Sequence, residues 1–172
     1  MLTATLWVAL GVIGAALITR GVKISEFRQA WIDGLRSDIA EYTSKAHEWI
    51  DIYLEFNNQT IQEKKIEITP KLERLKYDAL HIHNRISLRF KPGDKKANQL
   101  LKHLLDLLDP SKLDTEQSNA YSRWRELSDK AVQEARFLLK EEWEYTKNPL
   151  KKRFLKDKQW LFTPYKIKPV RK

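Results

Sequence analysis

An unbroken run of uncharged, mostly apolar residues fills positions 2–19, and it is the longest stretch of the chain without charge. Eighteen such residues are enough to cross a bilayer as a helix. All 32 Lys and Arg residues follow this run, beginning with Arg20 and Lys23. The positive-inside rule therefore predicts an N-terminus outside and a body in the cytoplasm. A cleaved signal peptide is the alternative, but no basic residue precedes the apolar run.

Two small residues of this predicted span stand four positions apart. Gly11 and Ala15 form a small-xxx-small pair, the spacing that lets two membrane helices approach closely. We expect them to be the packing surface if two spans associate.

After the span, apolar residues recur at steps of three and four, the period of one helical face. The pattern predicts a helix over about residues 23–57, either separated from the span by a bend at Gly21 or continuous with it. The stripe consists of Phe27, Trp31, Leu35, Ile39, Tyr42, Ala46, Trp49 and Tyr53.

The next helix is predicted to begin at Thr69 and Pro70, a favourable N-cap and first-turn pair, and to end near Phe90. Its apolar residues follow a heptad spacing typical of a coiled-coil seam. They are Leu72, Leu75, Ala79, Ile82 and Ile86. Residues 59–68 hold neither the helical nor the strand period, and their structure stays open.

The sequence Lys-Pro-Gly-Asp at 91–94 predicts a turn, followed by a leucine-rich helix over 95–108. Asp109 and Pro110 stop that helix. A last long helix ends at Asn148 and Pro149, and its stripe consists of Ala120, Trp124, Leu127, Ala131, Ala135, Leu138 and Tyr145.

These elements predict an all-α protein with three parts. Residues 1–22 form a transmembrane anchor, residues 23–148 form a cytoplasmic antiparallel bundle of about four helices, and residues 149–172 form a basic, aromatic C-terminal tail. Sparse glycine and proline agree with long helices. The four tryptophans beside the stripes, Trp31, Trp49, Trp124 and Trp143, are expected to pack in the core.

No residue pattern indicates catalysis, and no cofactor or metal is predicted. The chain has no cysteine, which excludes disulfides, thiolate zinc sites and a cysteine nucleophile. Glycine-rich phosphate loops, the nucleophile elbow and the zinc-protease motif are absent from the sequence. His47 and Asp51 share a helical face, whereas His81 and His83 cannot point the same way, so the histidines are interpreted as surface or boundary residues.

The net charge of +9 lies entirely in the C-terminal part. Residues 147–172 hold ten basic residues against Asp157 alone, which leaves 22 basic and 22 acidic residues before them. Cations mixed with aromatic rings suit an anionic membrane surface or a partner protein, with nucleic acid as a competing ligand. The residues predicted to bind are Lys151, Lys152, Arg153, Phe154, Lys156, Lys158, Trp160, Phe162 and Tyr165. The remaining alternative is a packed or disordered extension that binds no ligand.

Three arginines lie beside the stripes of the bundle. Arg28 and Arg36 flank Trp31, and Arg85 precedes the seam residue Ile86. We expect these arginines to pair with acids such as Asp38 or Glu41. The alternative is a polar network that recognises a partner.

Three segments resemble a diffuse group of uncharacterised bacterial membrane-anchored helical proteins with a single span. They are residues 26–42 (EFRQAWIDGLRSDIAEY), 84–94 (NRISLRFKPGD) and 139–144 (LKEEWE). The resemblance implies a bacterial inner-membrane protein with a helical cytoplasmic body, and it implies no activity or cofactor. The tail lies outside it.

The sequence therefore predicts a membrane-tethered, non-enzymatic helical module for interaction or oligomerisation, with a protein partner or a second copy of the chain. A membrane-perturbing effector of a bacterial defence or toxin system is the alternative. Nucleic-acid binding through the tail comes third. The partner, the oligomeric state and the physiological trigger are not specified by the sequence.

Overall fold

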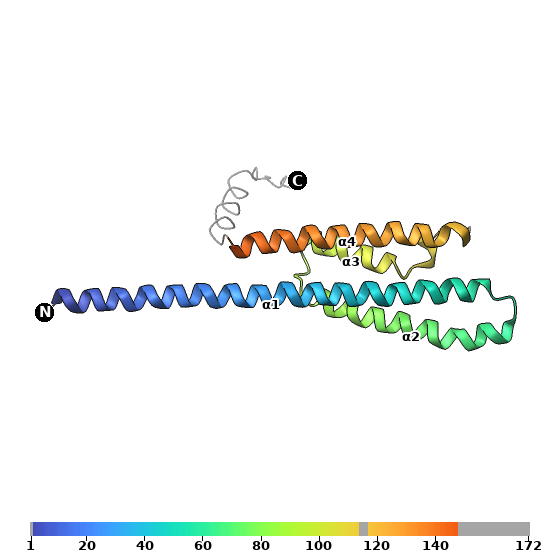
Figure 1. Ribbon diagram of the computed structural model, residues 1–172, viewed down its shortest axis with the longest axis horizontal. Helices are drawn as coiled ribbons and strands as arrows, with labels where there is room; N and C mark the ends of the chain where they lie inside the picture. The colour runs from blue at the N-terminus through green and yellow to red at the C-terminus, as the bar shows by residue number, and fades with distance from the viewer. Residues whose placement is uncertain (1, 114–116, 148–172) are drawn as a thin grey trace, which may run out of the picture. The chain divides into compact units, whose positions relative to one another are not determined.

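The computed structural model describes residues 2–113 and 117–147, and all regular structure within these ranges is helical. The helices are α1 (Leu2–Asn58), α2 (Gln62–Ser87), α3 (Lys95–Asp106) and α4 (Gln117–Lys147), with a 3₁₀ turn at Pro110–Lys112 (Figure 1). The predicted all-α class with about four helices is confirmed for this part of the chain. The chain divides into two compact units, residues 1–29 with 141–172 and residues 30–140, and each is described by itself.

The first unit contains the apolar part of α1. This helix is long and apolar enough to cross a membrane, and none of its most apolar window is buried. Ten large apolar side chains there are each at least 46% exposed: Leu6, Trp7, Val8, Leu10, Val12, Ile13, Leu17, Ile18, Val22 and Ile24. Gly21 does not bend the chain, because its backbone is part of the continuous helix.

The predicted stripe of α1 largely forms the core of the second unit. Leu35, Ile39, Tyr42, Ala46 and Trp49 are buried, and Trp31 and Tyr53 pack against them. Ile32 and Ile50 are also buried, which widens the stripe beyond the predicted positions. The prediction that Phe27 belongs to this buried stripe is wrong, since its side chain is 74% exposed.

The predicted start of α2 at Thr69 and Pro70 is wrong, because the helix begins at Gln62 and Pro70 lies inside it. Ile61 occupies the N-cap position in an extended conformation, so only residues 59–61 connect α1 to α2. Proline removes one helical hydrogen bond. The Thr69 hydroxyl donates to the Lys65 carbonyl at 2.7 Å, which satisfies a neighbouring acceptor in the same turn.

The heptad seam of α2 is confirmed. Leu75, Ala79, Ile82 and Ile86 are buried, and Leu72 packs against the same cluster. The helix ends at Ser87, slightly earlier than predicted.

The turn at 91–94 and the helix start at Lys95 are confirmed. Asp94 caps α3, since its carboxylate accepts hydrogen bonds of 3.1 Å from the amides of Lys96 and Ala97. In α4 the residues of the predicted stripe that are buried are Ala120, Trp124, Ala131, Ala135 and Leu138, with Leu127 packed against them. The side chain of Tyr145 lies outside the described residues, as do Asn148 and Pro149.

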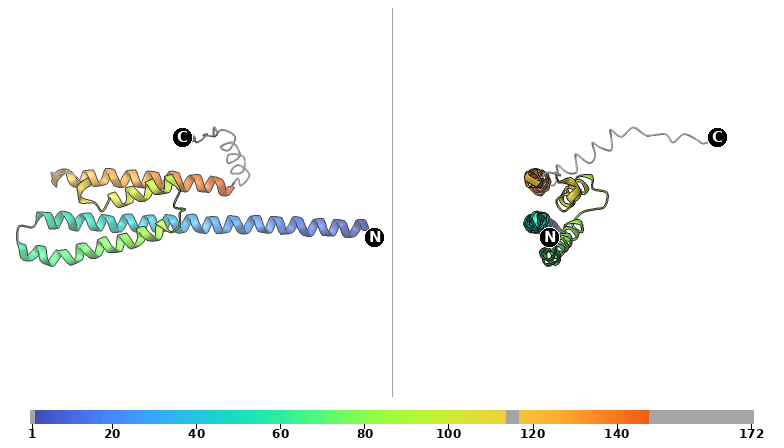
Figure 2. Two further views of the ribbon diagram at one scale, coloured as in Figure 1. Left: turned by 180° about the vertical axis from the view of Figure 1, so that it is seen from behind. Right: turned by 90° about the vertical axis from the view of Figure 1, so that its right-hand side faces the viewer.

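Contacts within residues 30–140 show how neighbouring helices run. Asp38 and Glu41 of α1 contact Arg89 and Arg85, so α2 returns along α1. In the same unit α3 lies beside α4 (Figure 2). The Tyr42 hydroxyl donates to the Leu104 carbonyl at 2.6 Å and ties α1 to α3. Burial, with the charge of Asp106, raises the pKa of Tyr42 well above its ordinary value, so this donor stays neutral.

Candidate functional site

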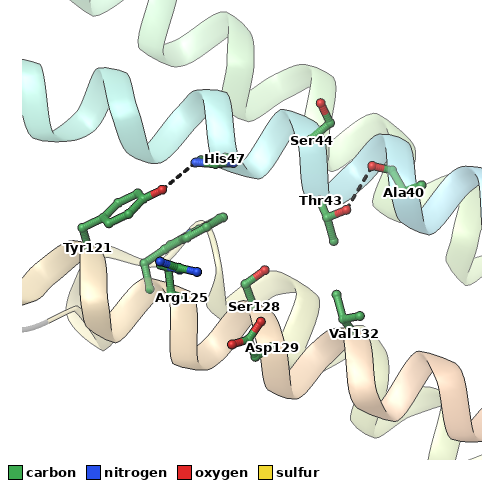
Figure 3. A pocket seen from close by; sticks show the side chains of 10 residues that line it. Ala40, Thr43, Ser44, His47, Tyr121, Arg125, Ser128, Asp129 and Val132 are labelled. Atoms are coloured by element: carbon green, nitrogen blue, oxygen red, sulfur yellow. Dashed lines mark hydrogen bonds between the residues drawn. The ribbon is translucent and has the colours of Figure 1, made fainter.

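A groove of about 550 Å³ lies between α1 and α4 within residues 30–140. One wall is a stretch of α1 with Ala40, Thr43 and Ser44, and the other is a stretch of α4 (Figure 3). The α4 wall consists of Tyr121, Trp124, Arg125, Ser128, Asp129 and Val132. Polar side chains and aromatic or apolar side chains both line the groove, so it offers hydrogen-bonding groups as well as apolar surface to a ligand.

An aromatic cluster closes one end of the groove. His47 Nε2 and the Tyr121 hydroxyl share a hydrogen bond of 2.8 Å, drawn in Figure 3. The His47 ring also lies 5.1 Å from the ring of Trp124, measured between centroids. The Trp124 indole is buried and donates to the Leu107 carbonyl at 3.1 Å. This chain of contacts fixes the wall before any ligand arrives.

Two side chains of opposite charge line the groove. Arg125 and Asp129 stand one helical turn apart on α4 and are exposed. Neither makes an ion pair or a side-chain hydrogen bond with the described residues. A guanidinium and a carboxylate on one wall can together recognise a ligand that carries both charges, such as a protein segment.

A second polar cluster joins α1 to α2, and it was predicted in part. Asp38 is buried beneath Arg85 and Arg89, with Arg85 Nε 2.9 Å from one carboxylate oxygen and Arg89 Nε 2.6 Å from the other. Arg85 also binds Glu41, and this bond, followed by the charge of Asp38, raises the pKa of Arg85. The Arg85 Nε contact is an ion pair only, since its N–H makes no hydrogen bond.

Gly34 makes room for this cluster. A Cβ atom at Gly34 would lie 2.9 Å from one guanidinium nitrogen of Arg89. Real Cβ atoms are not found that close to another heavy atom, so the bare backbone of Gly34 is part of the arrangement that holds Arg89 on Asp38.

The expected pairing of Arg85 with Asp38 or Glu41 is confirmed, whereas Arg36 pairs with Asp33 at 2.8 Å. The cluster around Asp38 connects α1 to the end of α2, and both oxygens of the Asp38 carboxylate are held by arginines. The roles of Arg89 and Gly34 were missed by sequence reasoning. A signal was present, because Asp38 falls on the apolar face of α1 between Leu35 and Ile39, where an acid requires a partner.

The histidines do not assemble a metal site. Among the described residues, no three His, Asp or Glu side chains gather closely enough to hold an ion. His83 is buried and bonds the Leu101 carbonyl at 3.0 Å, while His81 is exposed. His103 bonds Glu134 at 2.5 Å, and Gln99 donates to the same carboxylate at 2.9 Å.

The remaining predicted site residues are not brought into a site. Gly11 has no atom near the place of a Cβ, and Ala15 accepts a hydrogen bond from the Thr19 hydroxyl through its carbonyl. Their role in packing two spans stays a prediction. All nine predicted tail residues, from Lys151 to Tyr165, lie outside the described residues, so tail binding also stays a prediction.

The groove residues of α4 were not predicted as a site. Tyr121, Arg125, Ser128 and Asp129 share one side of a helix next to Trp124, and this grouping of polar residues beside a core tryptophan was the available signal. Comparison of the chain with protein-family profiles, with curated proteins and with solved structures finds no match.

Proposed function

We propose that this chain is a single-span membrane protein whose helical body is a non-enzymatic module for binding a protein partner or a second copy of itself. The observation that carries the proposal is the exposed apolar part of α1. Ten large apolar side chains of this helix are exposed, and none of its most apolar stretch is buried. Removing such side chains from water is worth about 1.5–3 kcal/mol each, which strongly favours insertion into a bilayer.

The orientation follows from the flanking charge. Arg20 and Lys23 come directly after the apolar stretch. They favour a cytoplasmic helical body and an N-terminus on the other side of the membrane. The resemblance of three segments to bacterial membrane-anchored helical proteins supports the inner membrane of a bacterium as the location.

Fractionation and a reporter test the anchor. The protein should stay with membranes in carbonate, a reporter fused after residue 172 should behave as cytoplasmic, and the intact mass should include residues 2–19. A periplasmic reporter signal would overturn the orientation, and a mass that lacks the apolar stretch would identify it as a cleaved signal peptide.

The interaction role rests on the groove between α1 and α4. Its aromatic end is fixed by bonds to the core, and Arg125 and Asp129 remain available to a ligand. A site that is rigid before binding loses little entropy on association. These are the properties of a recognition surface for a polar protein segment.

Site-specific photo-crosslinking tests the groove. A photoreactive phenylalanine derivative replaces Val132 on the groove wall, and a control copy carries it at Arg74, which is exposed on α2. We expect a discrete adduct from position 132 in intact membranes, lost when Arg125→Glu is added. Adducts of twice the chain mass would identify self-association. The same pattern from both positions would refute recognition by the groove.

A further inference from the structure

The chain enters the second unit from the apolar stretch at one end of that unit, which we call the entry end. Besides the first turns of α1 in this unit, the entry end consists of residues 88–95, between α2 and the start of α3, and residues 136–140 of α4. The ring of Phe90 meets Trp31 edge-on, with centroids 5.8 Å apart, so the loop after α2 lies beside the first turns of α1 in this unit. Figure 1 shows this loop crossing beside α1.

The α4 part of the entry end is placed by the contacts of Glu134. This carboxylate bonds Gln99 and His103 of α3, while Trp124, further back on α4, bonds the Leu107 carbonyl after α3. Rising numbers on α4 therefore approach the start of α3. Residues 136–140 follow Glu134 and lie toward Lys95.

Two of the most exposed large apolar residues of residues 30–140 belong to the entry end. Leu88 is 87% exposed and Phe137 is 70% exposed. Single exposed apolar residues are common on protein surfaces and need no function by themselves. What distinguishes Leu88 and Phe137 is the set of charged residues around them.

Four exposed cations accompany these residues, namely Lys91, Lys95, Arg136 and Lys140. None makes an ion pair with the described residues. Among the nearby acids, Asp38 binds two arginines, Asp94 caps α3, Glu134 binds His103, and Glu141 and Glu142 after Lys140 also make contacts. The segments of the entry end combine a net positive charge with exposed apolar groups, the composition of surfaces that bind an anionic leaflet.

The covalent connection brings this end close to a bilayer. Only residues 20–29 separate the apolar stretch from the second unit, and they span about 15 Å as a helix. The headgroup layer extends about 5–7 Å beyond the hydrocarbon core. An upright helix of this length would leave the entry end about 8–10 Å beyond the headgroups, and a tilt of the body toward the leaflet closes that gap.

We propose that the entry end is a second membrane contact, in which Leu88 and Phe137 enter the headgroup region of an anionic leaflet and the four cations hold its phosphate and carboxylate groups. This inference rests on the proposed membrane anchor. The contact would fix the height of the helical body above the bilayer and turn the groove between α1 and α4 toward partners at the membrane surface.

Because the chain contains no cysteine, single labels can be placed cleanly. Full-length Leu88→Cys and Phe137→Cys proteins, labelled with an environment-sensitive dye, are reconstituted into vesicles of phosphatidylserine and phosphatidylcholine that carry a headgroup nitroxide quencher. Tyr77→Cys is the matched control, since Tyr77 is also 70% exposed but lies in the middle of α2. Quenching at positions 88 and 137 should be severalfold stronger than at 77, and weaker in phosphatidylcholine alone.

A charge reversal separates lipid contact from simple proximity. Lys91→Glu with Arg136→Glu should lower the docked-to-free ratio by more than about fivefold for each residue, because each change removes a cation and adds an anion near the leaflet. Lys64→Glu with Lys71→Glu, at the opposite end of α2, should leave quenching unchanged. Helicity measured by circular dichroism checks that all variants fold.

Equal quenching at 77, 88 and 137 in vesicles that contain the protein would overturn the contact and leave the anchor intact. A protein that does not float with the vesicles would overturn the anchor and the contact together. Dye signals at 88 and 137 that change only on mixing with unlabelled protein would assign this surface to a second copy and also overturn the lipid contact.

Discussion

Gly34→Ala should stabilise the helical body by less than the helix propensity of alanine alone would give. In the interior of α1 the substitution alone would gain about 1 kcal/mol of helix propensity. The added Cβ would lie 2.9 Å and 3.0 Å from the two terminal nitrogens of Arg89 and 3.2 Å from Cζ. The terminal atoms of Arg89 must therefore shift, while the bond to Asp38 at 2.6 Å is made by a different atom, its Nε.

The cost of that shift is smaller than the gain, because the atoms that meet the new Cβ are the far end of a flexible side chain. The Arg89 Nε can stay on Asp38, and Arg85 remains on the same carboxylate. The net expectation is a stabilisation smaller than the gain in helix propensity of about 1 kcal/mol.

Removing the Arg89 side chain should release the full gain in stability. In an Arg89→Ala background no guanidinium meets the new Cβ, so Gly34→Ala should stabilise by about 1 kcal/mol. The four proteins form a double-mutant cycle, with unfolding by urea followed by tryptophan fluorescence in detergent micelles. A change of the same sign and size in both backgrounds would refute the account of Gly34.

Three further predictions concern the core and the tail. Ile82→Asp or Leu75→Asp should cost several kcal/mol by placing a charge among buried apolar groups, so a variant that melts with the wild type would remove that seam from the core. Tyr42→Phe should cost about 1 kcal/mol, since it removes the hydroxyl donor from the Leu104 carbonyl, which keeps the Leu107 amide as a donor, and the thermal midpoint should fall accordingly. Removal of residues 149–172 should weaken binding of the body to anionic vesicles with little change in helicity, and preference of the full tail for single-stranded oligonucleotide over such vesicles would favour the nucleic-acid reading instead.

The helices with clear apolar periodicity could be predicted because that signal is local. Leu75, Ala79, Ile82 and Ile86 share one face whatever the helix packs against, and all four are buried. Phe27 continued the period of α1 but is exposed, since periodicity records a face and not the presence of a partner. The residues at which helices begin and end were harder to predict, because a local start signal can lie inside a longer helix. Thr69 and Pro70 resemble a helix start, yet α2 runs through them from Gln62.

For the polar cluster of Asp38, Arg85 and Arg89, the sequence could predict the types of residue that pair but not which residues meet. Arg85 had to find an acid, and Asp38 and Glu41 were available on the neighbouring helix. Which arginine binds which carboxylate oxygen depends on the register between α1 and α2. That register depends on the length of the connection at 59–61. Since the predicted connection ended at Thr69, the position of Arg89 beside Gly34 could not follow from the sequence.

The groove was beyond sequence reasoning for a different physical reason. Its α1 wall consists of Ala40, Thr43 and Ser44, and such residues on a helix are usually interpreted as ordinary solvent-exposed surface. Opposite Ser128 of α4 they leave a hollow, because small side chains on two facing helices cannot fill the space between them. Larger apolar residues at these positions would bury more surface and stabilise the body. A chain that instead keeps small and polar groups there, beside an Arg125 and an Asp129 that bind no described residue, forgoes that stabilisation, and an occupant of the hollow would explain why.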